Sequence, residues 1–300
     1  MGQEILVIGG SRYFGIRLVE ALLAAGERVT IATRGRRPDP FGSRVQRIAV
    51  DRSDATAMQA AFAAARFDVV YDQVCYGPDE AALAAQLFSG KVGRYLMTST
   101  LEVYDALHGQ LARPYREDDL NLAQVVASPP TAYGDGKRRA EALLLAARGL
   151  PVATLRLAHV LGGVEDFTGR LRGYVERVLR DEPLPHAAAP GATSFIDVPG
   201  AVELLVWAGR QDFVGPLNVA SRGMLTAPQL HARIAARLGR KALMAPGADA
   251  AASPFDYAAP HVLHTGRASA LGWLFGPVDG WLDALIDAHA VALAGEGIGA

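Results

Sequence analysis

Short apolar runs alternate with helical patterns through the first half of this sequence, and this alternation constrains the fold more than any other feature. Residues 5–8 form a run of four apolar side chains that Gly9 and Gly10 close, as expected of a strand buried on both faces. Strands that alternate with helices form βαβ units, in which helices cover both faces of a parallel sheet. The sequence therefore predicts a doubly wound α/β domain. Further strands are expected at residues 29–33, 45–50, 68–74, 95–99 and 152–157, and helices at 53–65 (with Ser53 as N-cap), 79–88 and 131–148.

The alternation stops after residue 157, which predicts a second domain of different construction. We expect a first domain over residues 1–158 and a smaller one over 159–300, with part of 193–222 returning to the first. A smaller segment in this position usually closes a cleft over the first domain and binds substrate. Its expected elements are a strand at 194–198, helices at 169–180, 201–208, 228–238 (capped by Thr226) and 278–292, and a flexible loop at 245–253.

Composition and charge narrow the class of protein. Half of the 300 residues are hydrophobic and a fifth are charged, which is typical of a globular chain. Thirty basic and 31 acidic residues leave a net charge of −1, so no basic surface for nucleic acid is expected. No apolar run approaches the ~20 residues of a membrane span, and no signal peptide is recognised. A lone Cys75 and the isolated His261 and His264 suggest no metal site, and we expect a cytoplasmic protein that acts on a small molecule.

A glycine-rich loop follows the first strand and precedes the first helix. Glycines let the backbone approach a pyrophosphate, and the helix N-terminus adds free N–H groups and the positive end of its dipole. The loop differs from the usual dinucleotide-binding pattern in carrying Arg12 where glycine is common. It predicts that residues 1–158 form a Rossmann-type, dinucleotide-binding domain. The candidate cofactor-binding residues of the loop are Gly9, Gly10, Ser11, Arg12, Tyr13, Phe14 and Gly15.

The end of the second expected strand favours NADP over NAD. An NAD site usually has an acidic residue near Thr33 to bind the adenosine ribose, and none is present here. Arg34 follows at once, and a guanidinium suits the 2′-phosphate of NADP. Asp51, after the third strand, is placed either to accept from the adenine amino group or to cap the next helix.

A tyrosine and a lysine stand four residues apart at the start of the expected helix 131–148. This spacing puts Tyr133 and Lys137 on one helix face. A phenol has a pKa near ~10, and a neighbouring ammonium favours its ionised form, as a general acid/base near neutral pH requires. At its longest, the fifth expected strand runs from Tyr95 to Tyr104, and it carries hydroxyls at 98–100, at the edge where doubly wound sheets bind ligands.

Together these motifs resemble the extended short-chain dehydrogenase/reductase family, in its NAD-dependent epimerase/dehydratase group. The resemblance implies that Thr100 completes a catalytic triad with Tyr133 and Lys137. It also implies that the tyrosine exchanges a proton with substrate, that the lysine binds the nicotinamide ribose, and that hydride moves to or from the nicotinamide. The other segments that carry the resemblance are residues 99–104, 156–160, 195–198 and 271–273.

Several positions depart from the family pattern. Sugar-nucleotide dehydratases carry Thr-Asp-Glu at the triad hydroxyl, whereas this chain has Leu101 before Glu102, so the acid for a leaving hydroxyl is missing. Thr193 and Ser194 replace an Arg-Asp pair whose arginine commonly holds a nucleotide diphosphate. His159 replaces a usual asparagine and either contacts substrate or fills space with its polar atoms bound to backbone. The resemblance makes Glu102, His159 and Asp197 candidate substrate-binding residues.

The expected function is that of an NAD(P)-dependent oxidoreductase or epimerase acting on a hydroxyl or carbonyl carbon of a sugar, nucleotide-sugar or sugar-like substrate. Epimerase, dehydratase and reductase activities stay open. The alternative is a cofactor-binding sensor or RNA-associated protein without turnover, although the retained Tyr133 and Lys137 speak against it. The resemblance further implies a homodimer formed through the helices at 79–88 and 131–148.

Overall fold

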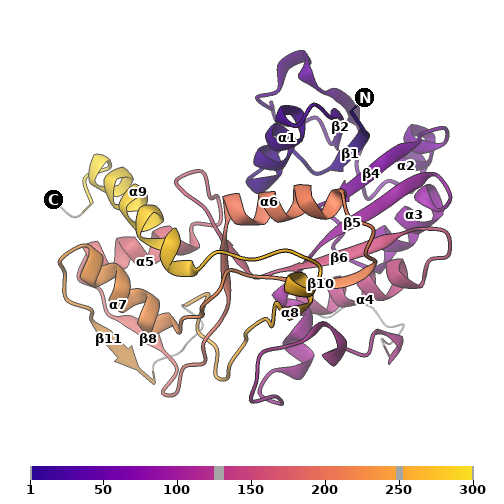
Figure 1. Cartoon of the computed structure of the whole chain (residues 1–300). Helices are drawn as coiled ribbons and strands as arrows, with labels where there is room; N and C mark the ends of the chain where they lie inside the picture. The colour runs from indigo at the N-terminus through magenta and orange to yellow at the C-terminus, as the bar shows by residue number, and fades with distance from the viewer. Residues whose placement is uncertain (1, 125–131, 248–252, 299–300) are drawn as a thin grey trace. The chain divides into compact units, whose positions relative to one another are not determined.

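The computed structural model describes residues 2–124, 132–247 and 253–298, and the chain divides into two compact units (Figure 1). The chain passes between the units several times, and a stretch that the sequence places in the first domain, Leu107–Arg116, lies in the second unit. Among the described residues, no helix combines the length and apolar character that crossing a bilayer requires. The first unit comprises Met1–Ala106, Glu117–Leu157 and Ala201–Val219, and the second comprises Leu107–Arg116, Ala158–Gly200 and Ala220–Ala300.

The first unit is built on a seven-stranded parallel sheet in the order β10-β6-β5-β4-β1-β2-β3. The order reverses direction beside β1, so the loops after β1 and β4 diverge at the carboxyl edge, where such sheets bind ligands. The predicted doubly wound α/β fold is confirmed. The strands are β1 Glu4–Ile8, β2 Arg28–Thr33, β3 Gln46–Ala49, β4 Phe67–Asp72, β5 Val92–Thr100, β6 Val152–Leu157 and β10 Gly215–Val219.

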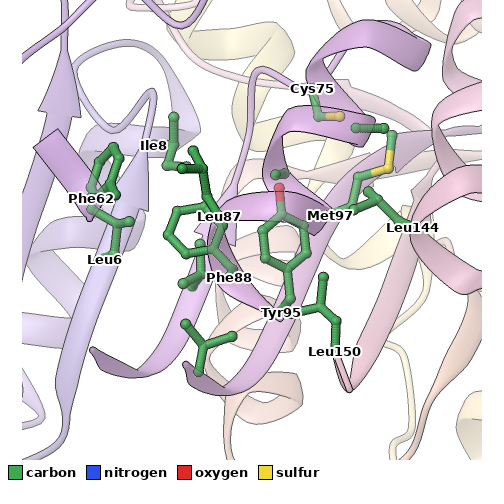
Figure 2. Packing of buried hydrophobic residues seen from close by; sticks show 14 of the residues in the cluster. Leu6, Ile8, Phe62, Cys75, Leu87, Phe88, Tyr95, Met97, Leu144 and Leu150 are labelled. Atoms are coloured by element: carbon green, nitrogen blue, oxygen red, sulfur yellow. The ribbon is translucent and has the colours of Figure 1, made fainter. Parts of the chain in front are cut away.

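Helices cover the sheet because alternate strand residues are apolar on both of its faces. On one face Phe88 packs edge-on against Phe62 and lies 5.9 Å from the Tyr95 ring, in a cluster to which Leu144 also belongs (Figure 2). Each fully buried side chain of this size stabilises the fold by about 1.5–3 kcal/mol. The helices of the unit are α1 Phe14–Ala24, α2 Ala55–Phe62, α3 Pro78–Phe88, α4 Tyr133–Ala146 and most of α6 Val198–Gly209.

Two local expectations in this unit are wrong. The run after β5 does not continue as a strand to Tyr104, because a 3-10 helix, η2 Leu101–Leu107, begins directly after Thr100. The N-cap of α2 is Asp54 rather than Ser53, and its carboxylate accepts from the Ala57 amide at 2.9 Å. Further 3-10 turns are η1 Gly42–Arg44, η3 Glu117–Asp119 and η4 Leu122–Gln124. Residue 131, where the tyrosine helix was expected to begin, lies outside the described residues.

The second unit has its own core, formed by α5, α7 and α9. The expected cap of α7 is confirmed: Thr226 accepts from the Gln229 amide and the Gln229 side chain accepts from the Thr226 amide. The expected loop at 245–253 begins inside strand β11, and its residues 248–252 lie outside the described part of the chain. The elements are β7 His159–Leu161 paired with β9 Phe195–Asp197, β8 Leu184–His186 paired with β11 Met244–Pro246, α5 Arg170–Leu179, α7 Ala227–Arg237, α8 Gly266–Ala270, the 3-10 turn η6 Val278–Gly280 and α9 Leu282–Gly295.

Candidate active site

The glycine loop joins β1 to α1 at the carboxyl edge of the sheet. Gly9 donates to the carbonyl of Ala32 at the end of β2, at 3.0 Å. Tyr13 is the N-cap of α1 and adopts a positive φ of 51°, and its side chain makes no capping hydrogen bond to the helix. The first turn of α1 contains no acidic residue. The structure thus places the loop, from Gly9 to Gly15, around a helix N-terminus whose charge suits an anion.

The ends of β2 and β3 bring the predicted adenosine-binding residues together. The amide of Val50, next to Asp51, donates to the carbonyl of Thr33 at 2.8 Å. Hydrogen bonds from Ser53 lower the pKa of Asp51, and the charges of Arg34 and Arg36 lower it further. Asp51 is therefore ionised beside two exposed arginines, and it does not cap α2.

Lys137 lies in a buried site at the start of α4. Only 1% of the residue is exposed, and its ammonium donates to the carbonyl of Thr98 at 2.8 Å. It lies 4.7 Å from the ring centre of Tyr76 and 5.9 Å from that of Tyr133. Burial lowers the pKa of Lys137 from its usual range. Two aromatic faces and one carbonyl thus surround a desolvated cation.

A close backbone approach places Tyr133 beside the end of β5. A Cβ on Gly134 would stand 2.1 Å from the carbonyl oxygen of Glu102, so only glycine lets the first turn of α4 meet η2. The Glu102 amide donates to the hydroxyl of Thr100 at 3.2 Å. Of the hydroxyls at 98–100, only Thr100 is more than marginally exposed, while Tyr133 is half exposed. The structure brings Thr100, Glu102, Tyr133 and Lys137 into one region of the first unit.

Tyr76 is a neighbour of this site that the sequence analysis did not identify. Its ring centre lies 6.3 Å from that of Tyr133, and half of the residue is exposed. Both its amide and that of Gly77 donate to the Glu80 carboxylate, which fixes the turn before α3. An aromatic residue two positions after a predicted strand, on the same sheet edge as a Tyr-x-x-x-Lys helix, is the signal that could have indicated it.

A buried ion pair anchors α4 behind the site. The guanidinium of Arg156 in β6 contacts both carboxylate oxygens of Glu141, which lies one helical turn after Lys137. Its remaining nitrogen donates to the hydroxyl of Tyr104 at 2.7 Å and to the carbonyl of Glu117 at 3.1 Å. One side chain therefore connects α4, β6, η2 and η3.

A second buried ion pair joins Arg52, after β3, to Asp72 at the end of β4. Arg52 contacts the Asp72 carboxylate at 2.5 Å, and Asp72 also accepts from the Tyr95 hydroxyl. The Cys75 thiol lies beside the guanidinium, and burial with the Asp72 charge raises the pKa of this thiol to about 12. A thiol with such a pKa is unreactive at neutral pH, so Cys75 acts as packing.

The second unit holds the two remaining candidates. His159 accepts from Arg170 through Nδ1 at 3.2 Å, because a guanidinium can only donate, so Nε2 carries the proton and donates to the Tyr257 hydroxyl at 2.9 Å. Both of these partners are side chains. Asp197 accepts from the Gly200 amide at 3.2 Å, and burial raises the pKa of its carboxyl.

Comparison with known proteins shows what part of the chain is similar to a known family. Residues 5–88 match the model of the NAD dependent epimerase/dehydratase family. Two curated relatives are the chloroplast stem-loop binding protein of 41 kDa b of Arabidopsis thaliana, 26% identical over 196 residues, and 2′-dehydrokanamycin reductase of Streptomyces kanamyceticus, 28% identical over 143 residues. The matches cover 61% and 46% of this chain, but only 48% and 40% of the relatives.

Solved structures agree with the sequence match. The Bordetella bronchiseptica enzyme WbmG, in complex with NAD and UDP, superposes with a TM-score of 0.75 at 19% identity, over 99% of this chain and 96% of that one. Thermus thermophilus UDP-glucose 4-epimerase in complex with NAD gives 0.68 at 20% identity, over 95% and 98%. The resemblance drawn from the sequence is thus confirmed: residues 5–88 match the model of the NAD dependent epimerase/dehydratase family, and the chain as a whole shares the fold of these two solved enzymes.

Proposed function

We propose that the chain is an oxidoreductase or epimerase that binds a nicotinamide dinucleotide along the carboxyl edge of its parallel sheet. Its substrate is a sugar, nucleotide sugar or sugar-like molecule with a reactive hydroxyl or carbonyl carbon. The observation that carries this proposal is the buried ammonium of Lys137, which the Tyr133 ring flanks at the strand end bearing Thr100. A desolvated cation beside a half-exposed phenol is the arrangement that acid/base catalysis by tyrosine needs.

The residues at the glycine loop fit a dinucleotide by their chemistry. The N-terminus of α1 offers backbone donors with no acidic side chain in its first turn, and the exposed Arg34 and Arg36 stand near Asp51 at the neighbouring strand ends. This combination suits a pyrophosphate next to a phosphorylated adenosine, and we propose that NADP binds more tightly than NAD. When bound, the dinucleotide accepts or supplies the hydride.

The protein groups then handle the proton. In the oxidative direction, ionised Tyr133 removes the proton of the substrate hydroxyl as the hydride leaves the carbon, and in reduction the neutral phenol returns a proton to the carbonyl oxygen. Lys137 stabilises the phenolate by its charge and contacts the ribose, and Thr100 holds the substrate oxygen. Glu102 is the second candidate base on this edge. A purified protein that retains its cofactor would favour an epimerase, which returns the hydride to the same molecule.

Tyr133→Phe tests the proposal directly. It deletes the phenol oxygen and keeps the ring over Lys137, so turnover on a panel of UDP- and dTDP-hexoses and their keto derivatives should fall by about a hundred- to ten-thousandfold. NADP(H) affinity should stay nearly unchanged, whereas Lys137→Ala should lose both turnover and affinity, and Thr100→Val should fall between. Tyr76→Phe is the matched control, because it removes the neighbouring phenol oxygen and should cost far less. Near-normal turnover of Tyr133→Phe would eliminate this mechanism and leave Glu102 as the base.

A second candidate function is RNA binding without turnover. The observation in its favour is the 26% identity with the chloroplast stem-loop binding protein, whereas the net charge of −1 opposes it. Titration with a labelled stem-loop RNA at two salt concentrations decides between them. Tight, salt-sensitive binding by a protein that turns over no substrate of the hexose panel would establish the RNA-binding function.

We also propose a homodimer that pairs α3 and α4 with the same helices of a second copy. Alanine-rich helices permit close packing, and α4 exposes 42% of Leu143. Light scattering at micromolar concentration measures the state, and a monomer would contradict the proposal.

A further inference from the structure

Gln73 places its side chain across the glycine loop. It follows the last residue of β4, and its amide donates to the carbonyl of Ile8 in β1 at 3.0 Å. Its side-chain oxygen lies 2.4 Å from the position that a Cβ on Gly15 would take, and Gly15 is the second residue of α1. The carboxamide therefore fills the space that the missing side chain of Gly15 leaves at this helix N-terminus.

The amide nitrogen of this carboxamide is buried without a protein partner. Gln73 is 9% exposed, and its Nε2 makes no hydrogen bond to any of the residues that the structure describes. A buried donor left unpaired costs about 1–3 kcal/mol, so native proteins rarely keep one without a reason. A leucine or methionine of similar length would fill the same space without this cost.

We propose that Gln73 Nε2 donates a hydrogen bond to the pyrophosphate of the bound dinucleotide. This inference rests on the proposed dinucleotide binding and adds a side-chain ligand to the backbone donors of the loop. The carboxamide of Gln73 reaches the uncapped N-terminus of α1, which itself attracts an anion, and the first turn of α1 holds no acidic residue that would repel it. A glutamine contributes the hydrogen bond without adding a charge at the switch point of the sheet.

The proposal predicts that one substitution leaves thermal stability intact but weakens ligand binding. Gln73→Met keeps the length of the side chain but removes the donor, so the ligand-free protein should melt no lower than wild type, because an unpaired buried amide has been removed. The same variant should bind NADP⁺ and ADP about ten- to a hundredfold more weakly, as expected for loss of a hydrogen bond to a charged group. A merely structural glutamine would lose stability and affinity together.

Calorimetric titration of the cofactor-free full chain separates the possible contacts. The probes are NADP⁺, ADP, AMP and inorganic pyrophosphate, of which AMP lacks the second phosphate. Gln73→Glu, which places a carboxylate at the same point, should weaken NADP⁺ and ADP more than Gln73→Met does. Gln59→Met and Gln59→Glu on the exposed face of α2 are the matched controls and should bind all four probes like wild type.

The outcomes are distinct. Weakened NADP⁺ and ADP with unchanged AMP supports the proposal. Equal binding of NADP⁺ by wild type and Gln73→Met overturns the role of Gln73 and leaves dinucleotide binding intact. An equal loss for AMP and ADP assigns the residue to the adenosine or to loop structure, and so overturns it as well. A wild type that binds neither NADP⁺ nor NAD⁺ refutes the proposed function and, with it, this inference.

Discussion

Two buried arginines, Arg156 in β6 and Arg52 after β3, are satisfied to different degrees. Every nitrogen of Arg156 has an oxygen partner, from Glu141, Tyr104 or the Glu117 carbonyl. Arg52 shares one nitrogen between the Asp72 carboxylate and the Glu80 carbonyl. Its Nε and Nη1 have no hydrogen-bond partner within the described chain.

This difference in hydrogen bonding corresponds to the different roles that we propose for the two parts of the sheet edge. Under the proposed function, Tyr133 and Lys137 in the half with β5, β6 and α4 have to keep one geometry, and a fully paired ion pair supports it. The half with the glycine loop carries spare buried donors, on Arg52 and on Gln73 Nε2. Unpaired buried donors are costly in a core, and under the proposed function this edge of the sheet receives an anionic ligand that can pair with them.

The strongest test of this contrast is Arg156→Met. It leaves the Glu141 carboxylate buried without its partner, so the free energy of unfolding should fall by about 3–5 kcal/mol, as measured by urea denaturation. The double variant Glu141→Leu/Arg156→Met removes both charges and should recover most of that loss. If the double variant were as unstable as the single one, the pair would not be the source of the stability.

Arg52→Met should cost less, about 2–3 kcal/mol in the same measurement. Asp72 keeps the Tyr95 hydroxyl as a donor, and the two unpaired nitrogens disappear with the guanidinium. A loss as large as that of Arg156→Met would erase the contrast between the two halves.

Arg34→Ala tests the proposed adenosine-binding residues at the end of β2. If Arg34 contacts the 2′-phosphate, the variant should lose about ten- to a hundredfold in NADP⁺ affinity and little in NAD⁺ affinity. Fluorescence titration of the apo-protein with both cofactors measures this. Arg44→Ala, in the 3-10 turn before β3, serves as the control, and a parallel loss for both cofactors would contradict a 2′-phosphate contact.

The smallest expected effect is the contribution of Lys137, in α4, to the pH dependence of the free energy of unfolding. Burial lowers the pKa of Lys137 in the folded protein below its ordinary 10.5. At a pH between the lowered pKa of folded Lys137 and the ordinary pKa of the unfolded chain, the unfolded chain binds more protons than the folded protein. The free energy of unfolding of wild type should therefore rise with pH relative to Lys137→Met, by at most about 1.4 kcal/mol per pH unit. Urea denaturation between pH 7 and 10 measures the slope, and Lys241→Met reports what removal of an exposed lysine does. Parallel curves for wild type and Lys137→Met would mean that the ammonium is not desolvated.

Features that depend on residues close together in the sequence were predictable, and features that depend on contacts between distant segments were not. The glycine loop, the strands and the Tyr133/Lys137 spacing are local patterns, and the structure forms them at the expected positions. Neighbouring residues with equal chemistry were misjudged, as with Ser53 and Asp54, since both cap helices well.

The remaining misses depend on how separate loops fold against one another. Gly134 is required by the carbonyl of Glu102, and no helix pattern contains that information. The roles of Tyr76 and Gln73 can be inferred only from the residues of α4 and α1 that they contact. A single sequence shows which side chains end a strand, but the register of neighbouring strands decides which of them meet.

The last strand of the sheet has a consequence for synthesis on the ribosome. β10, Gly215–Val219, pairs with β6 only after the chain has left the first unit and returned, and Asn218 then accepts from Tyr104 while its amide donates to Glu117. The parallel sheet therefore stays open at its β6 edge until more than two thirds of the chain has emerged. During that interval β6 presents an unpaired edge of the kind that recruits foreign strands. The nascent chain thus keeps a strand edge unpaired for longer than a chain whose sheet closes in order of synthesis.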